Sequence, residues 1–467
     1  MRHFMMSLMK TRLWLILCIA MLAIALFSKT VTAQEAAKVP QLTTAGTFTG
    51  QIFPAYFPFQ GRYLAVLSDA DMVASAYLDN NLGPKSPSMR DELTLIPLAN
   101  GLQGFKPIRL PVSNAVTAWP SILAISSDGR FAYVAEVDRP PASGDTQRAQ
   151  LQPGPNVNVI DLSNPASPRI VQTVQVQGRT QAAALSADSK LLAVSLSRNN
   201  NEHIYIYPIQ TNGQLSQPSI LKFPGVDEAP LHIEFSPQGN FLAAIFAGRN
   251  EARFARYQVT GNSVRLEPWG EPLITGKFPS VGHWTSDGRH LIVTNLNWFG
   301  GTADRYVGTG NSTLAVIAFN AQPNREGKIT HTIVSTASVG ASAEEFAISP
   351  DGRRVVSLNM HNSFLPPNDP RLSYYSSLTL VDCDRQTGEL TPRGTYLFES
   401  ILPEGITFDA SGKFLAVANF AHFNPQRSVE ETTVDFWRVV DGIEPKLVQL
   451  DVKVPVMRGA HVVKLIP

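Results

Sequence analysis

Histidines, carboxylates and arginines occupy equivalent positions in a pattern that recurs along the chain. When the copies are aligned on their recurrent turn, the polar residues that open the first strand of each copy are Ser121, Gln181, His232, His283, Glu344 or Glu345, and Glu404. Arg179, Arg458 and His461 lie close to the same position of the pattern. An imidazole beside a carboxylate can activate water, and a guanidinium can stabilise the oxyanion that forms when water attacks an ester. The pattern therefore predicts catalytic residues at His232, Glu345 and Glu404, and ligand-binding residues at Arg179, Gln181, His283, Arg458 and His461. The alternative is a ring of hydrated channel residues that perform no chemistry.

Two further histidines follow the ends of predicted strands. His361 lies just beyond Asn359, and His422 just beyond Asn419. An Asn at a strand end usually bonds the backbone of the turn, which is the simpler interpretation of these positions. We count both histidines as candidate ligand-binding residues, and with nearby carboxylates they could hold a metal ion. No spacing matches a zinc or calcium motif, so no cofactor is predicted, although a divalent cation stays open.

The elements that must position these residues come from a repeat. Each copy is an apolar strand, a turn of the Ser-Pro-Asp-Gly type and a second apolar strand. Gly supplies the positive φ of a tight turn, and Asp or Ser bonds the backbone of the bend. Copies span 122–136, 182–196 and 232–246, centre on Gly288, Gly352 and Gly412, and begin with a degenerate copy at Gly61. Successive turns lie 49 to 68 residues apart, which fits one four-stranded sheet plus loops.

Seven such hairpins without a long amphipathic helix predict an all-β fold, a single β-propeller of seven four-stranded blades. Further strands are expected near 157–162, 204–207, 314–319, 378–382 and 434–439. The C-terminal segment 459–465 resembles an inner strand and is expected to complete the first blade, because closure leaves no exposed edge. Two β-sandwiches, or six or eight blades, are the alternatives.

Enlarged loops are expected to gather on one face of this propeller. They connect the second and third strands of five blades, at 69–91, 138–156, 295–312, 359–376 and 419–431. Loops on a rigid scaffold commonly carry binding residues. We therefore expect any site to lie at this looped mouth, although plain surface decoration is the alternative.

The blade sequences at 133–136, 292–295 and 416–419 resemble the Tyr-Val-Thr-Asn repeat propellers. Residues 50–467 also resemble the seven-bladed lactonase superfamily, which includes 6-phosphogluconolactonase and carboxymuconate cyclase. The segment 230–237 is similar to the family segment that carries Pro, Arg and His, so His232 matches its histidine. This resemblance implies hydrolysis of a lactone in the channel.

Three positions depart from that family pattern. Leu231 stands where the family has Arg, Glu404 stands where Pro-Arg-Gly carries its phosphate-binding Arg, and Gly248-Arg249 replaces an Asn-Glu pair. These differences argue against a sugar-phosphate substrate and leave other lactones open.

The first 33 residues have the layout of a secretory signal. Basic residues precede the apolar run 13–27, and small residues before Gln34 suit a signal peptidase. We expect a signal peptide over 1–33, a lead-in over 34–49 and the propeller over 50–467, in a periplasmic or secreted protein. An uncleaved anchor is the alternative, although 15 apolar residues are short for a membrane span.

Composition excludes several classes of protein. Charged residues make up 16% of the chain, and its net charge of +1 becomes −3 without residues 1–33, because 35 bases then face 38 acids. Nucleic-acid binding is therefore not expected.

Cys383 is the sole cysteine beyond residue 33, so no internal disulfide can form. Nucleophile-elbow, Walker and His-Glu-x-x-His motifs are absent. A monomer without membrane contact beyond the export signal is expected.

Two main functions stay open. The preferred hypothesis is a propeller that binds a small-molecule ligand or a partner protein at the looped mouth. The alternative is a lactonase-type hydrolase in which His232 and a channel carboxylate direct water onto a ring ester. A third hypothesis, a subunit of a redox enzyme, lacks a cofactor site in the sequence.

Overall fold

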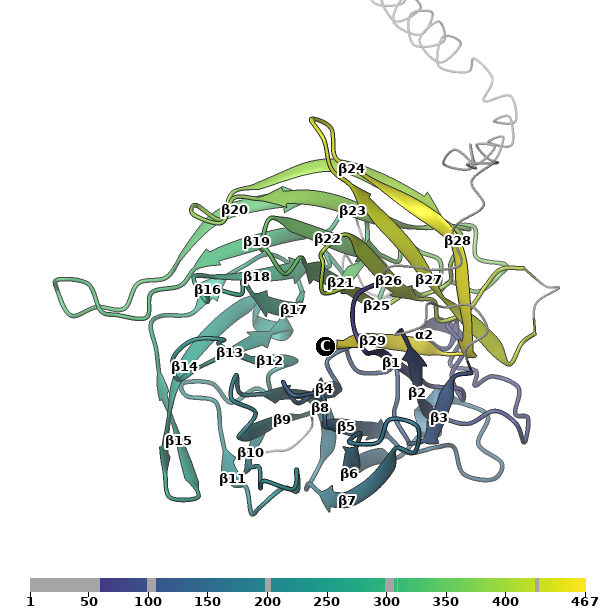
Figure 1. The fold of residues 1–467 in the computed structure, drawn as a ribbon, viewed down its shortest axis with the longest axis horizontal. Coiled ribbons are helices and arrows are strands. Elements are labelled where there is room, and N and C mark those ends of the chain that lie inside the picture. The colour runs from purple at the N-terminus through teal and green to yellow at the C-terminus, as the bar shows by residue number, and fades with distance from the viewer. Residues whose placement is uncertain (1–58, 99–105, 198–202, 299–305, 309, 425–427) are drawn as a thin grey trace, which may run out of the picture. The chain divides into compact units, whose positions relative to one another are not determined.

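Seven antiparallel sheets stand in a ring in the part of the chain that the structure describes (Figure 1). This computed structural model describes residues 59–98, 106–197, 203–298, 306–308, 310–424 and 428–467. Each sheet has four strands, and one gains a short fifth strand. The fold is a seven-bladed β-propeller, which confirms the predicted fold class. The expected signal peptide 1–33 and lead-in 34–49 lie outside the described residues.

Each blade runs from an inner strand at the ring centre to an outer strand at the rim. The inner strands are β29 (Ala460–Ile466), β4 (Leu123–Ile125), β8 (Arg179–Leu185), β12 (His232–Phe235), β17 (Pro279–Trp284), β21 (Ala343–Ile348) and β25 (Gly405–Phe408). The second strands are β1 (Tyr63–Ser68), β5 (Phe131–Asp138), β9 (Leu191–Ser197), β13 (Phe241–Phe246), β18 (His290–Asn295), β22 (Arg354–Asn359) and β26 (Phe414–Ala418). Most of these strands are apolar and buried because blades pack against both faces.

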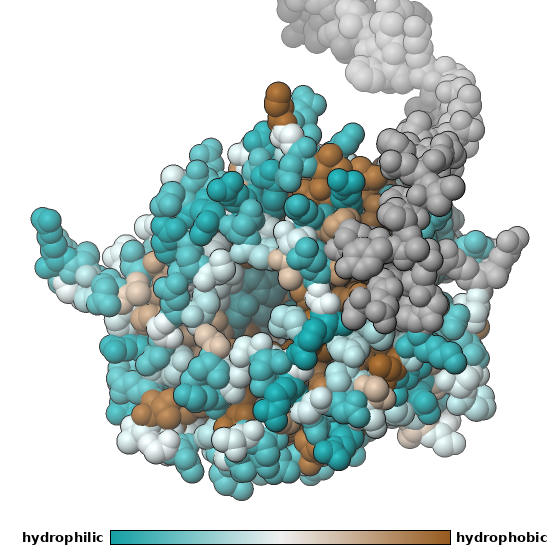
Figure 2. All heavy atoms as spheres, viewed as in Figure 1, coloured by the Kyte–Doolittle hydropathy of each residue, from teal (hydrophilic) through white to brown (hydrophobic). Residues whose placement is uncertain are grey.

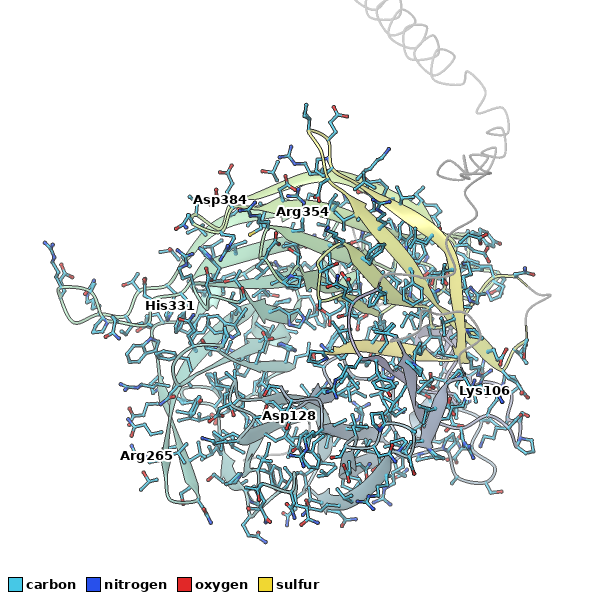
Figure 3. All side chains as sticks on the ribbon, viewed as in Figure 1. Lys106, Asp128, Arg265, His331, Arg354 and Asp384 are labelled. Carbon is cyan, nitrogen blue, oxygen red and sulfur yellow. The ribbon has the colours of Figure 1, made fainter. Side chains whose placement is uncertain are left out.

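The third strands include all five that were expected from the sequence. They are β2 (Glu92–Pro97), β6 (Pro153–Asp161), β10 (Ile204–Pro208), β14 (Glu251–Thr260), β19 (Thr313–Ala318), β23 (Ser376–Cys383) and β27 (Glu431–Val440). The outer strands are β3 (Ile108–Pro111), β7 (Arg169–Gln175), β11 (Ser219–Leu221), β15 (Ser263–Pro268), β20 (Thr332–Ser338), β24 (Leu390–Phe398) and β28 (Lys446–Met457). The additional strand β16 (Leu273–Ile274) pairs with β14. In Figure 3, Arg265 of β15 lies at the rim, whereas Asp128 of an inner hairpin turn lies nearer the centre.

The recurrent turns have the predicted conformation. In the sixth blade, Ser349 donates its hydroxyl to Asp351 at 2.6 Å, and the Gly352 amide donates to the Ser349 carbonyl at 2.8 Å. Gly352 has φ +71° and Gly288 has φ +66°. Ser189 takes the same turn position with φ +54°, as one non-glycine exception. The turn sequence therefore sets the pairing of each inner strand with its second strand.

The ring is closed by the C-terminal strand. β29 pairs antiparallel with β1, from Tyr63 opposite Ile466 to Ser68 opposite Ala460. At the same joint, the Gln60 amide donates to Asp409 of the last blade at 3.0 Å. The predicted closure is confirmed, because β1 has a partner strand on both sides.

Apolar contacts between blades form the core. Leu64 and Val66 of β1, for example, pack with Ala416 of β26 and Phe436 of β27. The described helices are short and lie in connections: α2 (Ala76–Asp79), η1 (Arg148–Gln150) and η2 (Ala247–Arg249). Among the described residues, no helix is long and apolar enough to span a membrane.

The turn geometry gives a first prediction. Replacing Gly288 or Gly352 with Val should lower the free energy of unfolding by about 1–3 kcal/mol, because a β-branched residue resists positive φ. A Cβ at either position has its nearest neighbours at 3.5 Å or beyond, so the cost is conformational rather than steric. Denaturant unfolding measures it. The control is Ser189→Gly, which places a glycine at the same positive φ and should leave stability unchanged or raise it. Unchanged stability in both Val variants would contradict the turn assignment.

Candidate functional site

A cavity of about 330 Å³ opens on the face where the inner strands begin and the second strands end. We call it the mouth cavity. Its polar walls include Asp138 at the end of β5, Arg179 at the start of β8, Glu344 near the start of β21 and Glu404 just before β25. Residues from the predicted long loops add aromatic walls: Tyr77, Trp298 and Tyr306. Loops and inner strands of several blades thus converge at one mouth, as expected from the sequence.

Glu404 is the most unusual residue in this cavity. Its side chain is almost fully buried, and neither carboxyl oxygen has a hydrogen-bond partner among the described residues. Gly405 allows this position, since a Cβ there would lie 2.7 Å from the backbone nitrogen of Val463 in β29. Burial raises the pKa of Glu404 well above its ordinary value, and the charges of Glu344 and Asp69 raise it further. The protonated form is therefore favoured.

Glu344 is a second buried carboxyl in the same wall. Burial raises its pKa well above the ordinary value, and the neighbouring charge of Glu345 adds to the effect. Two such carboxyls that influence one another titrate as a pair, so one can hold a proton while the other is ionised. This is the arrangement that general acid–base chemistry requires.

A hydrogen-bond donor belongs to a residue of the same cavity wall. The indole Nε1 of Trp119 is buried without a partner among the residues described. Trp119 packs against Trp298 with ring centroids 5.8 Å apart, and Trp298 packs against Tyr306 at 5.6 Å. The cavity therefore offers aromatic faces, one indole N–H and two carboxyls, which suits a polar ring-shaped ligand.

Arg179 also lies in the mouth cavity, but its charge is compensated. Its Nε donates to Asp138 Oδ1 at 2.7 Å, and its Nη2 donates to Asp138 Oδ2 and to Thr117 Oγ1. A bidentate pair of this kind holds the wall in place. Arg179 is therefore a poor candidate for binding an anion.

A separate polar cluster, the channel cluster, lies among the inner strands next to this cavity and comprises His232, Glu234, His283 and Glu345. Figure 2 shows a hollow near the ring centre that hydrophilic residues line. His232 Nε2 donates to the Gly282 carbonyl at 2.8 Å, which leaves Nδ1 to accept from Ser121 at 2.7 Å. Burial, together with the charge of His283, lowers the pKa of His232 to about 4. His232 is thus a neutral imidazole with both nitrogens in use, which does not favour it as a general base.

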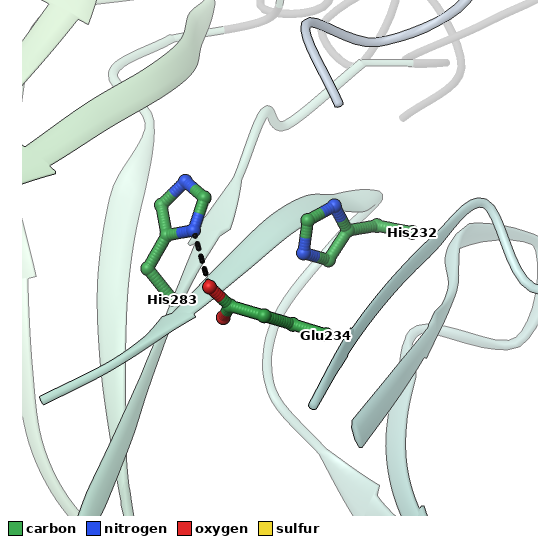
Figure 4. Close-up of side chains that lie close together, drawn as sticks. All are labelled: His232, Glu234 and His283. Carbon is green, nitrogen blue, oxygen red and sulfur yellow. Dashed lines mark hydrogen bonds and ion pairs between the residues drawn. The ribbon is translucent and has the colours of Figure 1, made fainter. Parts of the chain in front are cut away.

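His283 bridges two carboxylates in the channel cluster. Its Nε2 lies 2.7 Å from Glu345. Its Nδ1 lies 3.3 Å from Glu234, the contact that Figure 4 shows. Burial alone would lower the pKa of His283, but the charges of Glu345 and Glu234 raise it to about 10. Burial raises the pKa of Glu345, but the charge of His283 and its hydrogen bond lower that pKa below its ordinary value. His283 is therefore an imidazolium that lies between the carboxyl groups of Glu345 and Glu234.

The channel cluster also contains the residues best placed to hold a metal ion. His232, Glu234 and His283 offer ligand atoms within 4.8 Å of one another. Imidazole and carboxylate donors suit a transition-metal ion such as Zn²⁺. Binding would require His283 to lose its proton and His232 to give up one of its hydrogen bonds, to Gly282 or to Ser121. The observed contacts favour internal ion pairing.

The remaining predicted residues lie outside these two sites, and among them Arg458 and His422 line one surface pocket. Gln181 is buried at an irregularity of β8, and His461 bonds Asn114 at 2.8 Å inside the first blade. Arg458 donates to the Ala70 carbonyl at 2.8 and 2.6 Å. His361 bonds Ser377 at 2.8 Å and His422 bonds Thr433 at 3.0 Å, and the two histidines line different surface pockets. The structure therefore brings together His232, His283 and Glu345 in one cluster, and Arg179 and Glu404 in another.

Several cavity residues were not singled out from the sequence. Tyr77, Trp119, Arg148 and Trp298 line the mouth cavity. Tyr77, Arg148 and Trp298 belong to the enlarged loops, and Trp119 lies in the connection before β4. The enrichment of aromatic residues in segments that were expected to meet at one mouth was the available signal.

Comparisons with known proteins agree with this architecture. No protein-family model matches the chain. A putative 6-phosphogluconolactonase from Bacteroides fragilis is 16% identical, with 87% of this chain and 98% of that chain covered and a TM-score of 0.56. The periplasmic gluconolactonase PpgL of Pseudomonas aeruginosa is also 16% identical, with 87% and 99% covered and a TM-score of 0.53. The fold is that of the 6-phosphogluconolactonase-like propellers.

At the sequence level, a 6-phosphogluconolactonase of Photorhabdus laumondii is 35% identical over 86 residues. The match spans 18% of this chain and about a quarter of that relative. The seven-bladed resemblance inferred from sequence is thus confirmed for the fold, whereas the Tyr-Val-Thr-Asn resemblance stays a prediction.

The channel cluster predicts a pH-dependent stability. The pKa of His283 is raised from 6.5 to about 10 on folding, so its ion pairs stabilise fully below pH 6.5 and are lost as pH rises towards 10. His283→Gln should therefore lower the free energy of unfolding by about 3 kcal/mol near pH 6, and by progressively less towards pH 10. Denaturant unfolding at several pH values measures the difference.

The matched control is His361→Gln. Burial lowers the pKa of His361, so its titration lies at or below pH 6.5 in both states. Its effect on stability should not change between pH 6.5 and 10. A pH-independent effect of His283→Gln over that range would contradict the imidazolium assignment.

Proposed function

We propose that the protein hydrolyses a lactone in the mouth cavity. The observation that carries this proposal is Glu404, a buried carboxyl without a hydrogen-bond partner among the described residues, beside the buried carboxyl of Glu344. Leaving a buried polar group unpaired costs free energy, so such a group is retained where a ligand or a reaction uses it. Neighbours of the same fold that are named as lactonases support this choice over binding alone.

The chemistry needs one base, one acid and one oxyanion donor. Water adds to the ring carbonyl and gives its proton to the ionised member of the Glu344–Glu404 pair. The ring C–O bond then breaks, and the protonated member gives its proton to the leaving ring oxygen, so that the product is a hydroxy acid. Burial raises the pKa of both carboxyls, which favours the protonated form that the leaving oxygen requires.

Trp119 is the proposed oxyanion donor. Its unpartnered Nε1–H lies in the same lining as the two glutamates. A donor that is already in place when negative charge develops on the carbonyl oxygen lowers the barrier without reorganisation. The aromatic faces of Trp298 and Tyr306 would hold the ring in place.

A second candidate is binding of a partner protein at the same face. It is favoured by Tyr374 and Val429, whose side chains are 62% and 69% exposed beside an apolar pocket next to the mouth. Large exposed apolar residues that cluster beside a pocket are typical of contact surfaces. On this proposal the carboxyls would hold a ligand without turnover.

We also propose that the protein works outside the cytoplasm as a monomer. The charged and apolar layout of residues 1–33 supports export, and one structural neighbour is named as periplasmic.

The hydrolase proposal predicts that Glu404→Gln lowers kcat/KM for lactones by about 10²–10⁴-fold, the usual worth of a general acid or base. Glu344→Gln should act in the same direction. A pH-indicator assay on neutral and acidic lactones, with and without calcium, measures turnover. The control is Glu326→Gln, an exposed residue of the β19–β20 connection, which should be as active as wild type. Absence of turnover on every lactone, with the fold intact, would favour the binding candidate.

Export predicts a shortened chain. When the full-length gene is expressed with an export pathway, the mature protein should begin at Gln34. Intact mass spectrometry of the exported protein measures this. An intact N-terminus on a membrane-bound form would instead identify an anchor.

A further inference from the structure

We propose that Arg148 binds a carboxylate on the substrate, so that the lactone opened in the mouth cavity is an acidic one. This inference rests on the proposed hydrolase function and adds the class of its substrate. Arg148 was not among the residues singled out from the sequence, and it comes from the loop between β5 and β6.

Arg148 is held in a fixed position by a neighbouring loop. Its backbone amide donates to the Asn80 carbonyl at 2.9 Å, and the next amide, of Ala149, donates to the Asn80 side chain at 2.9 Å. The guanidinium carbon lies 5.6 Å from the centroid of the Tyr77 ring, and the Tyr77 hydroxyl donates to the Val116 carbonyl at 2.8 Å. Backbone and side chain are thus both anchored at the cavity wall.

The charge of Arg148 is not compensated by the described part of the chain. No described carboxylate forms a salt bridge with it, and its Nε is buried without a hydrogen-bond partner there. Arg179, in the same cavity, shows the contrast, because Asp138 pairs with it through both carboxylate oxygens. The cavity therefore contains one guanidinium that needs an anion and one that already has one.

The guanidinium geometry indicates which anion would bind. The guanidinium of Arg148 lies over the Tyr77 ring, and guanidinium N–H groups match the two oxygens of a planar carboxylate. The carboxyls of Glu344 and Glu404 come from the sixth and seventh blades, whereas Arg148 comes from the second. A ligand that spans the cavity can place its ring carbonyl at the glutamates and its carboxylate at Arg148.

Two lactones that differ only in this group provide the test. D-glucaro-1,4-lactone carries a carboxylate where D-glucono-1,4-lactone carries a hydroxymethyl group, on the same five-membered ring. Wild-type kcat/KM should be about tenfold or more higher for the acidic lactone, the scale of a charge-assisted hydrogen bond. Arg148→Gln should lose this preference through a raised KM, with turnover of the neutral lactone retained, and Arg148→Lys should keep part of it.

The control variant is Arg139→Gln, an exposed arginine of the same loop, which should keep the wild-type preference. Equal wild-type activity on the two lactones, or an equal loss on both in Arg148→Gln, would overturn the inference while leaving the hydrolase proposal intact. A wild-type preference for 6-phosphogluconolactone over the acidic lactone that disappears in Arg148→Gln would also overturn the inference, because Arg148 would then bind a phosphate.

If neither lactone is turned over, the hydrolase proposal fails and Arg148 is tested by binding. Calorimetric titration with glucarate, the open dicarboxylate, should then give about tenfold weaker binding to Arg148→Gln than to wild type. Absence of glucarate binding to the wild-type protein would overturn the carboxylate site.

Discussion

The pairing of β29 with β1 is the contact on which the mouth cavity depends. It joins the two ends of the described chain in one sheet, from Tyr63 opposite Ile466 to Ser68 opposite Ala460. The cavity takes residues from most of the blades, so their separations are defined only when the ring is closed. The backbone of β29 also packs so closely on Gly405 that only a glycine fits, and this contact sets the position of Glu404. Ring closure and the position of Glu404 are thus one structural feature.

Adjacent residues of β21 serve two different purposes. Glu345 bonds His283 at 2.7 Å in the channel cluster, whereas Glu344 lines the mouth cavity. The register of β21 shifts between Ala343 and Glu345, so Glu344 lies at a β-bulge, and one residue step separates a satisfied ion pair from a carboxyl in the cavity wall. The ion pair keeps Glu345 ionised, and its charge helps to keep Glu344 protonated. The channel cluster therefore affects the protonation of a carboxyl in the mouth cavity.

The repeat predicted the fold well because its cause is local. Each Ser-x-Asp-Gly turn sets its own hairpin, and the five further strands and the closing strand were recognisable as short apolar runs. It was harder to predict which side chains meet one another inside the channel. A register shift between Pro279 and Gly282 precedes His283, which meets the unpredicted Glu234 as well as the predicted Glu345. Arg148 lies in an irregular loop, where no periodicity links it to Tyr77, and only the folded loops reveal that contact.

The charge at position 404 suggests how one scaffold can change its substrate. The phosphogluconolactonase motif that this segment resembles has an Arg at this position. An Arg is a permanent cation, so it holds an anion but cannot exchange a proton. Glu404 is buried beside Glu344, and this burial raises its pKa, so its protonated form is favoured and its proton can be given or taken. The cation is then supplied from another blade by Arg148, whose loop is bonded to that of Tyr77. On this proposal, acid–base chemistry occupies the inner-strand end of the cavity and anion recognition moves to a loop, where it can vary without disturbing ring closure.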